Sequence, residues 1–314
     1  MRLAGACAVA LLAAVVFACS AVLQQRSARS VPEEKSLTLG LLRALWSNRS
    51  WLAGVGMMLA AYGLQVLALA LGPVALVEPL IATEIVFAVP VAIHLAGQRP
   101  GPREWAGMVM ATGGIGAFLL GADPARGLSH ATTEHWLVGA LPWAVAVVAL
   151  LAGARGPETP RRAGLLAAAA GVTFGLFSLV TKAALGQLAQ HGMAGLSTSW
   201  EPEALLVLGL GGFLIGQSAY QAASLASSLP IMDAIEPISA VLLAAYVLDE
   251  HLSLSATGLT LEALGAVGAV GGIFILGRSP LVLVLYASTE RDKQRRATHR
   301  VAKQAPARPA SLAR

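Results

Sequence analysis

The sequence predicts an all-α integral membrane protein with about nine transmembrane helices, arranged as two inverted four-helix repeats joined by a linker helix. Three observations indicate this fold class. The 314-residue chain is 56% hydrophobic and 12% charged, with a mean hydropathy of +0.69, whereas a soluble domain carries about 25% charged residues. Apolar blocks long enough to cross a hydrocarbon core of about 30 Å recur along the chain. Two parts of the sequence also resemble each other.

The apolar blocks define the predicted spans and, with them, the domain boundaries. The spans are 3–24, 51–71, 74–96, 104–121, 135–153, 163–187, 203–227, 230–248 and 256–277. The polar stretches 25–50 and 188–202 are predicted as loops. The chain then divides into a first transmembrane repeat (1–121), a linker helix with flanking loops (122–160), a second, inverted repeat (161–278) and a basic tail (279–314).

Loop charges set the predicted orientation. With nine spans, the basic stretches 25–50, 99–103, 155–162 and 279–314 all fall on one side of the membrane. The positive-inside rule makes that side cytoplasmic, so we expect an external N-terminus and a cytoplasmic C-terminus in the plasma membrane. A cleaved signal peptide over the first span is an alternative. It would export the basic 25–50 loop, against the charge rule.

An internal repeat links the two halves of the chain. Glu78-Pro79 matches Glu236-Pro237 at an offset of 236 − 78 = 158, and the same offset pairs Tyr62 with Tyr220. Chance similarity between alanine- and glycine-rich helices is the alternative, but Glu-Pro and Tyr are uncommon in such helices. An odd span between two four-helix units inverts the second unit, which is typical of secondary transporters.

Several passages resemble a known superfamily. They are "ALALGPVALVEPL" (68–80) and the closing helices "REWAGMVMATGGIGAFLLG" and "LEALGAVGAVGGIFILG". Together they are similar to the drug/metabolite transporter superfamily, in particular its EamA-like members. The layout, with a lone span between the halves, is closest to that of the NIPA-type magnesium transporters. The resemblance implies transport of a small metabolite or ion by alternating access, with Mg²⁺ transport as the alternative. Glu78 stands where the NIPA type tends to have a small polar residue.

Four carboxylates lie inside predicted spans, where ionisable groups are costly and usually functional. They are Glu78, Glu84, Asp233 and Glu236. Next to a proline, which frees a backbone carbonyl, such a group is a candidate cation or proton site. A kink with a carboxylate in a water-filled vestibule is the other interpretation. Oxygen ligands from Glu84, Asp233 and Glu236 would suit Mg²⁺, but the sequence alone assigns no metal ligands.

Other polar residues inside the spans are candidates for lining a substrate pathway. These are Tyr62, Gln65, Gln217, Tyr220, Gln221 and Lys182. The tyrosines and glutamines have interhelical hydrogen bonding as their alternative role. Lys182 has two alternatives, extension toward the membrane surface or pairing with Glu78. A further cluster, Asp249 to His251, is predicted as a solvated turn.

The sequence contains no signature of an enzyme or of a cofactor site. It has no phosphate-binding loop, no HExxH motif and no paired cysteines, so we expect no catalytic activity and no cofactor. The basic stretch after Ser288 has no aromatic residue suited to binding nucleic acid. The expected partners are a small-molecule or ion substrate and the lipid bilayer, and a homodimer is compatible with the sequence. The rival from another class is a non-transporting membrane assembly subunit.

Overall fold

The computed structural model describes residues 2–28, 40, 43, 45–95, 99–123, 133–156, 160–222, 225–250, 252–253 and 255–278. Every regular element within them is an α-helix. The helices are α1 (Arg2–Ala28), α3 (Arg49–Leu71), α4 (Val74–Ile81), α5 (Glu84–Leu95), α6 (Pro102–Ala122), α7 (Thr133–Gly153), α8 (Pro160–Ser197), α9 (Glu201–Ala222), α10 (Leu225–Val247) and α11 (Ala256–Gly277).

Eight helical segments in the described ranges are long and apolar enough to cross a membrane. They are α1, α3, α4 with α5, α6, α7, α8, α9 and α11. The predicted class, an all-α membrane protein, is confirmed at this level. Each predicted span falls on a helix, with two exceptions. The span 74–96 falls on two consecutive helices, α4 and α5, and the end predicted at residue 227 lies beyond α9, which ends at Ala222, inside α10, which begins at Leu225.

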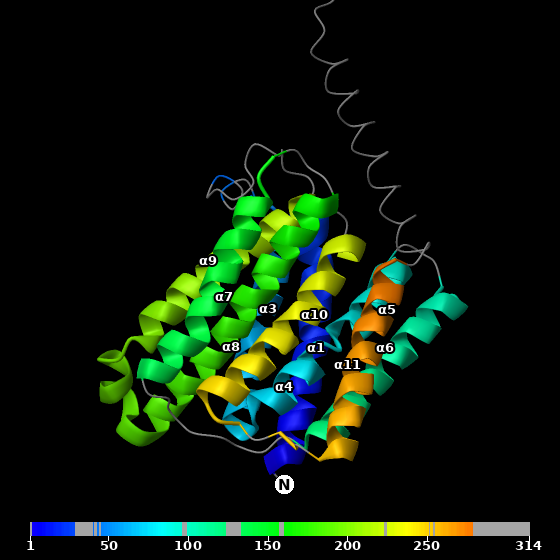
Figure 1. The fold of residues 1–314 in the computed structure, drawn as a ribbon. Coiled ribbons are helices and arrows are strands. Elements are labelled where there is room, and N and C mark those ends of the chain that lie inside the picture. Colours follow the sequence, from blue (N-terminus) through cyan, green and yellow to red (C-terminus); the bar gives the residue numbers. More distant parts are fainter. Residues whose placement is uncertain are drawn as a thin grey trace, which may run out of the picture.

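The helices form a bundle (Figure 1), in which α1 packs through one alanine-rich face. The alanines let other helices approach closely. Ala6, Ala10, Ala13, Ala14 and Ala18 are fully buried. The α1 helix packs mainly on α3, and α8 packs on both α9 and α10. The α7 helix lies on the outside of the bundle, with little of its surface buried.

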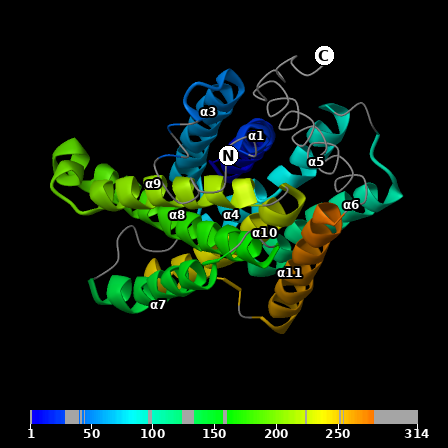
Figure 2. The ribbon, with the colours of Figure 1, turned by 90° about the horizontal axis from the view of Figure 1, so that it is seen from above.

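The α6 and α11 helices form a tightly packed pair at one side of the bundle (Figure 2). Glycines make this contact possible. A Cβ on Gly114 would lie 2.1 Å from the Ala269 nitrogen, and one on Gly272 would lie 2.3 Å from the Ala111 nitrogen. No side chain fits at either position, so the two backbones meet directly.

The segment predicted as one span at 74–96 is broken between α4 and α5. The Ala82 nitrogen still donates to the Glu78 carbonyl, but the Thr83 nitrogen and hydroxyl both turn to the Leu80 carbonyl, at 3.2 Å and 2.6 Å. A side chain that bonds its local backbone competes with the helix in this way. The break places Glu84 at the first turn of α5, where a carboxylate complements the helix dipole.

The Glu-Pro pairs do not themselves break their helices. Pro79 lies inside α4 and the break follows it, whereas α10 runs unbroken through Pro237. The sequence therefore identified an irregular region near residue 79 but not the position of the break.

The α8 helix continues to Ser197, so the prediction of a loop over 188–202 was wrong for residues 188–197. Gly192 has a positive φ of 65° that bends the segment, and the chain resumes its helical course beyond it. The residues around Gly192 include leucine, alanine, glutamine and methionine, which favour helix even where they are polar or exposed.

Candidate functional site

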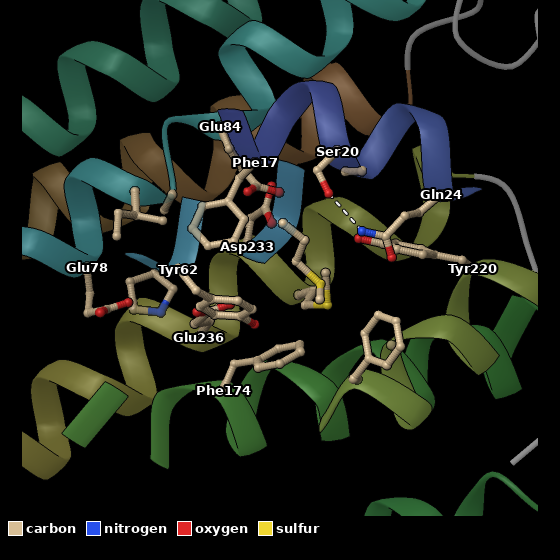
Figure 3. Close-up of a pocket in the computed structure, with 18 of the residues that line it drawn as sticks. Phe17, Ser20, Gln24, Tyr62, Glu78, Glu84, Phe174, Tyr220, Asp233 and Glu236 are labelled. Atoms are coloured by element: carbon tan, nitrogen blue, oxygen red, sulfur yellow. Dashed lines mark hydrogen bonds between the residues drawn. The ribbon is translucent and has the colours of Figure 1, made fainter. Parts of the chain in front are cut away.

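A cavity of about 70 Å³ lies among α1, α3, α4, α5, α8, α9 and α10, and it gathers most of the predicted pathway residues (Figure 3). Its polar and aromatic lining consists of Phe17, Ser20, Gln24, Tyr62, Glu78, Glu84, Phe174, Phe213, Gln217, Tyr220, Asp233 and Glu236. The helices come from both halves of the chain, so residues more than 200 positions apart in sequence share this space.

The cavity is acidic. Glu78, Glu84 and Asp233 are buried, and Glu236 is half-buried one turn after Asp233 on α10. The carboxyl groups of Glu84 and Asp233 face one another across the α5–α10 contact (Figure 3). The described lining includes no lysine, arginine or histidine. A solute in this cavity would therefore meet carboxyl groups and no cationic side chain from the described lining.

Aromatic rings lie among these carboxyl groups (Figure 3), and Phe177 packs behind them outside the lining. Tyr62 is the centre of this group, with the Phe17 ring edge-on at 5.0 Å and the Phe177 and Phe174 rings at 5.5 Å and 6.3 Å. The faces of such rings attract cations. The ring group and the carboxylates therefore favour the same charge in a solute.

One polar group connects Glu78 to two other helices. Gln65 Nε2 donates to Glu78 Oε1 at 2.9 Å and to Ser178 Oγ at 3.1 Å. Gln65 thus contributes to the site through Glu78. Ser178, which the sequence analysis did not identify, lies on α8 about one turn before Lys182.

A second polar group, which we call the Gln217 layer, consists of Ser20, Gln24, Trp51 and Gln217. Gln217 Nε2 donates to Gln24 Oε1 at 2.5 Å, and Trp51 Nε1 donates to Gln217 Oε1 at 3.0 Å. Ser20 Oγ accepts from Gln24 Nε2 and donates to the Gly54 carbonyl. The layer joins α1 and α3 to α9. Of its members, the sequence analysis identified Gln217 alone, because Ser20, Gln24 and Trp51 look like ordinary polar and aromatic residues near helix ends.

A third group, the Glu250–Lys182 layer, lies beyond Glu78 on the side of the α10–α11 loop. The Glu250 carboxylate accepts from the Val74 and Ala75 nitrogens at 2.9 Å and 3.0 Å, at the start of α4. Lys182 Nζ donates to the Leu69 and Gly72 carbonyls, both at 2.6 Å. These bonds satisfy orphan groups at the end of α3 and the start of α4.

Two sequence expectations change at this layer. The solvated turn predicted over Asp249 to His251 is wrong for Glu250, which is 4% exposed. His251 lies outside the described residues. Burial raises the pKa of Glu250 above its ordinary range, and the Ala75 and Val74 N–H groups and the Lys182 charge oppose the rise. Lys182 binds main-chain carbonyls, an arrangement that neither of its two predicted roles anticipated.

Three buried oxygen atoms near the cavity have no hydrogen-bond partner among the described residues. They are Gln65 Oε1, Glu78 Oε2 and Asp233 Oδ2. The amide oxygen of Gln65 is always an acceptor, and the two carboxyl oxygens accept when their groups are ionised. Buried polar atoms normally have a partner, so these atoms fit a solute or water molecule that donates hydrogen bonds or carries positive charge.

The structure thus places seven of the ten predicted pathway residues on one cavity. They are Glu78, Glu84, Asp233, Glu236, Tyr62, Gln217 and Tyr220. Gln65 lies one hydrogen bond away, Lys182 belongs to the Glu250–Lys182 layer, and Gln221 is buried in α9 outside the cavity lining. In the described part of the chain, no set of three His, Cys, Asp or Glu side chains is arranged to hold a metal ion.

Comparison with known proteins adds one relative. An uncharacterized protein of Corynebacterium glutamicum is 29% identical over 245 residues, which cover 77% of this chain and 83% of that protein. No family model matches the chain. No solved structure matches it either.

Proposed function

We propose that this protein is a membrane transporter that moves a small cationic solute by alternating access. The observation that carries the proposal is the acidic and aromatic cavity formed by helices from both halves of the chain. Ionisable groups in a membrane interior are expensive and usually mark a substrate or ion pathway. Four of them converge on one small space here, together with unpartnered acceptor oxygens.

The charge of the cavity supports a cation over an anion. Four carboxylates line it and no described basic side chain compensates them. The carboxylates are spread around the cavity, and no described set has the geometry of a metal site. A monovalent inorganic or small organic cation fits this arrangement better than a bare Mg²⁺ ion, which demands near-ideal octahedral ligands.

The contacts between α6 and α11 support the predicted inverted repeat. At an offset of 158 residues, Gly114 corresponds to Gly272 and Ala111 to Ala269. Gly114 meets the Ala269 nitrogen, and Gly272 meets the Ala111 nitrogen. Any antiparallel pair of helices has such reciprocal contacts. The support for the repeat is that corresponding positions in this contact carry the same residue type, glycine with glycine and alanine with alanine.

The same reciprocity holds one turn further along both helices. A Cβ on Gly107 would meet the Leu276 side chain, and a Cβ on Gly265 would meet the Phe118 backbone. At the same offset, Gly107 corresponds to Gly265 and Phe118 to Leu276. Two inverted four-helix units around a linker helix account for this pattern. They also agree with the resemblance to the EamA-like members of the drug/metabolite transporter superfamily, whose implied mechanism is alternating access.

Uptake into proteoliposomes tests the proposed function. The panel holds monovalent inorganic cations, small organic cations, Mg²⁺, neutral metabolites and anions. The proteins are the unmodified chain, Glu78→Gln, Glu84→Gln and Glu236→Gln, with Glu203→Gln as a control, because Glu203 is exposed in the first turn of α9. We expect uptake of a cation that falls at least about tenfold in one or more cavity variants, since each change removes a charge that a buried cation needs.

Three results would contradict the proposal in different ways. Uptake of Mg²⁺ alone would favour the magnesium alternative. Equal uptake by all variants would exclude a carboxylate site. Absence of uptake for the whole panel would favour a non-transporting assembly subunit.

A further inference from the structure

We propose that the Glu250–Lys182 layer is the gate that closes the cavity toward the side of the membrane that holds the α10–α11 loop. Opening this gate would connect the cavity to that side. The closure stands on its own geometry, and its use in transport rests on the proposed function.

The layer lies one helical turn from the cavity in two helices at once. Val74 and Ala75, which Glu250 binds, precede Glu78 by about one turn of α4. Lys182 follows Ser178 by one turn of α8, and Ser178 binds Gln65, the partner of Glu78. A solute leaving Glu78 in this direction therefore meets the Glu250 and Lys182 side chains next.

The surroundings of the layer are closely packed. Leu69 and Val74 are fully buried, and a Cβ on Gly72 would lie 2.9 Å from the Ala6 Cβ of α1. The α3–α4 turn therefore packs directly against α1 beside the layer.

The layer joins the two halves of the chain through contacts that can separate. Glu250 and Lys182 belong to the second half, and all four of their described main-chain partners lie in the first half, around the α3–α4 turn. Hydrogen bonds from side chains to main-chain atoms can break without unfolding either helix. If one half rocks against the other, these bonds are the ones that must break on this side.

In this proposal the Gln217 layer, of which Ser20, Gln24 and Gln217 line the cavity, is the counterpart of the gate. It also joins the two halves, through Gln24 and Trp51 of the first half and Gln217 of the second. Both layers are formed in this structure. Alternating access requires that one layer opens while the other stays closed, so changes at the two layers should act on opposite sides.

Cysteine labelling tests the closure directly. In a background with Cys7→Ala and Cys19→Ala, Ser178→Cys places a thiol of similar size behind the layer, at a position that is 1% exposed. A membrane-impermeant maleimide is added from the side on which an exposed reference, Thr198→Cys, reacts. We expect slow labelling of Ser178→Cys. Adding Glu250→Ala or Lys182→Met should raise its rate at least about tenfold, because each removes two charge-assisted hydrogen bonds.

The matched control is Gln217→Ala, which weakens the opposite layer and should leave labelling of Ser178→Cys from this side unchanged. Labelling of Thr198→Cys and the elution profile in detergent, compared across all backgrounds, verify that each variant is folded. The proposal is overturned if Glu250→Ala and Lys182→Met label no faster than the parent, or if Gln217→Ala raises labelling as much as they do.

A reversible cross-link tests the link to transport. Ala75→Cys and Glu250→Cys, joined by a short bis-methanethiosulfonate reagent, hold the α10–α11 loop against α4. We expect cation uptake to stop after cross-linking and to return after reduction. Undiminished uptake with the cross-link in place contradicts the gate. If the unmodified chain transports no cation, the proposed function is contradicted instead, and the labelling result still decides the closure.

Discussion

Glu250 combines burial with a position outside the membrane spans, and this makes the closed gate sensitive to pH. Burial raises its pKa more than the α4 N–H groups and Lys182 lower it. The charged groups that act on it are Lys182 of α8 and, with like charge, Glu78 of α4. When the layer opens and water reaches the carboxyl group, its pKa returns to the ordinary value of about 4.3.

The sign of the pH effect follows from this difference. Glu250 binds a proton more tightly in the closed layer than in the open layer. Acidification therefore stabilises the closed state. This stabilisation is lost as the pH rises through the raised pKa of Glu250. We expect labelling of Ser178→Cys, normalised to Thr198→Cys, to slow as the pH is lowered. In Glu250→Gln this dependence should disappear. Labelling that speeds up on acidification would contradict the assignment.

The Gln217 layer gives a second prediction for single residues. A Cβ on Gly54 would lie 2.8 Å from the Gln24 Cγ and 3.2 Å from the Gln24 nitrogen. Gly54→Ala should therefore displace Gln24 and weaken its bond to Gln217, and it should reduce uptake. Gly56→Ala on the same helix has open space around it and should leave uptake unchanged. Equal uptake by both variants would show that the layer tolerates displacement of Gln24.

Sequence patterns identified charged residues of the site better than neutral ones. Glu78, Glu84, Asp233 and Glu236 are conspicuous because a carboxylate is costly in an apolar span. Ser20, Gln24, Trp51 and Ser178 gave no such signal, since their role depends on which helices meet. Glu250 was misinterpreted for the same reason: its two N–H donors lie about 175 residues away in sequence, and only the folded chain brings them together.

At the scale of helices, the α6–α11 contact yields a prediction with matched controls. Gly114→Ala and Gly272→Ala each place a methyl group against backbone atoms, and overpacking of this kind costs about 1–3 kcal/mol. Gly113→Ala and Gly116→Ala, which face open space, should be neutral or slightly stabilising because alanine favours helix. Thermal unfolding in detergent, followed by size-exclusion chromatography, measures the difference. Similar losses at all four positions would contradict the direct contact of the two backbones.

Helix positions followed from hydropathy, but helix irregularities did not. The ends of α3, α6 and α11 fall within two residues of the predicted spans. The break between α4 and α5 depends on the Thr83 hydroxyl bonding the Leu80 carbonyl, a choice that the apolar pattern does not encode. The extension of α8 past residue 187 follows from residues that favour helix. Hydropathy alone predicted a loop there, because these residues are too polar to span a membrane.

For the whole molecule, the orientation in the membrane is a prediction from loop charges, and cysteine labelling tests it. Lys35→Cys in the cysteine-free background should react only from the cytoplasmic side, because the positive-inside rule retains the basic 25–50 stretch there. Thr198→Cys should react only from outside. The measurement compares intact cells with inverted vesicles. Labelling of residue 35 from outside would contradict the nine-span topology and favour a signal peptide.

The overall class was predictable because composition and the recurrence of apolar blocks constrain a membrane chain strongly. The arrangement of the halves was predictable only as far as the repeat extends. Glu84 has Leu242 as its counterpart at the offset of 158. The repeat therefore does not predict the position of the Glu84 carboxyl group. Its position opposite Asp233 comes from the break in the first half, and α10 has no matching break.

The length of α8 has a practical consequence for imaging. The part before the kink at Gly192, residues 160–191, extends over roughly 48 Å at 1.5 Å per residue, beyond a hydrocarbon core of about 30 Å. The exposed stretch around Gly192 therefore emerges from a detergent or lipid belt as a protruding segment. A 32.1 kDa chain is small for single-particle cryo-electron microscopy. A peptide epitope inserted after Gly192, bound by an antibody fragment, would supply the mass and the orientation marker that such images require.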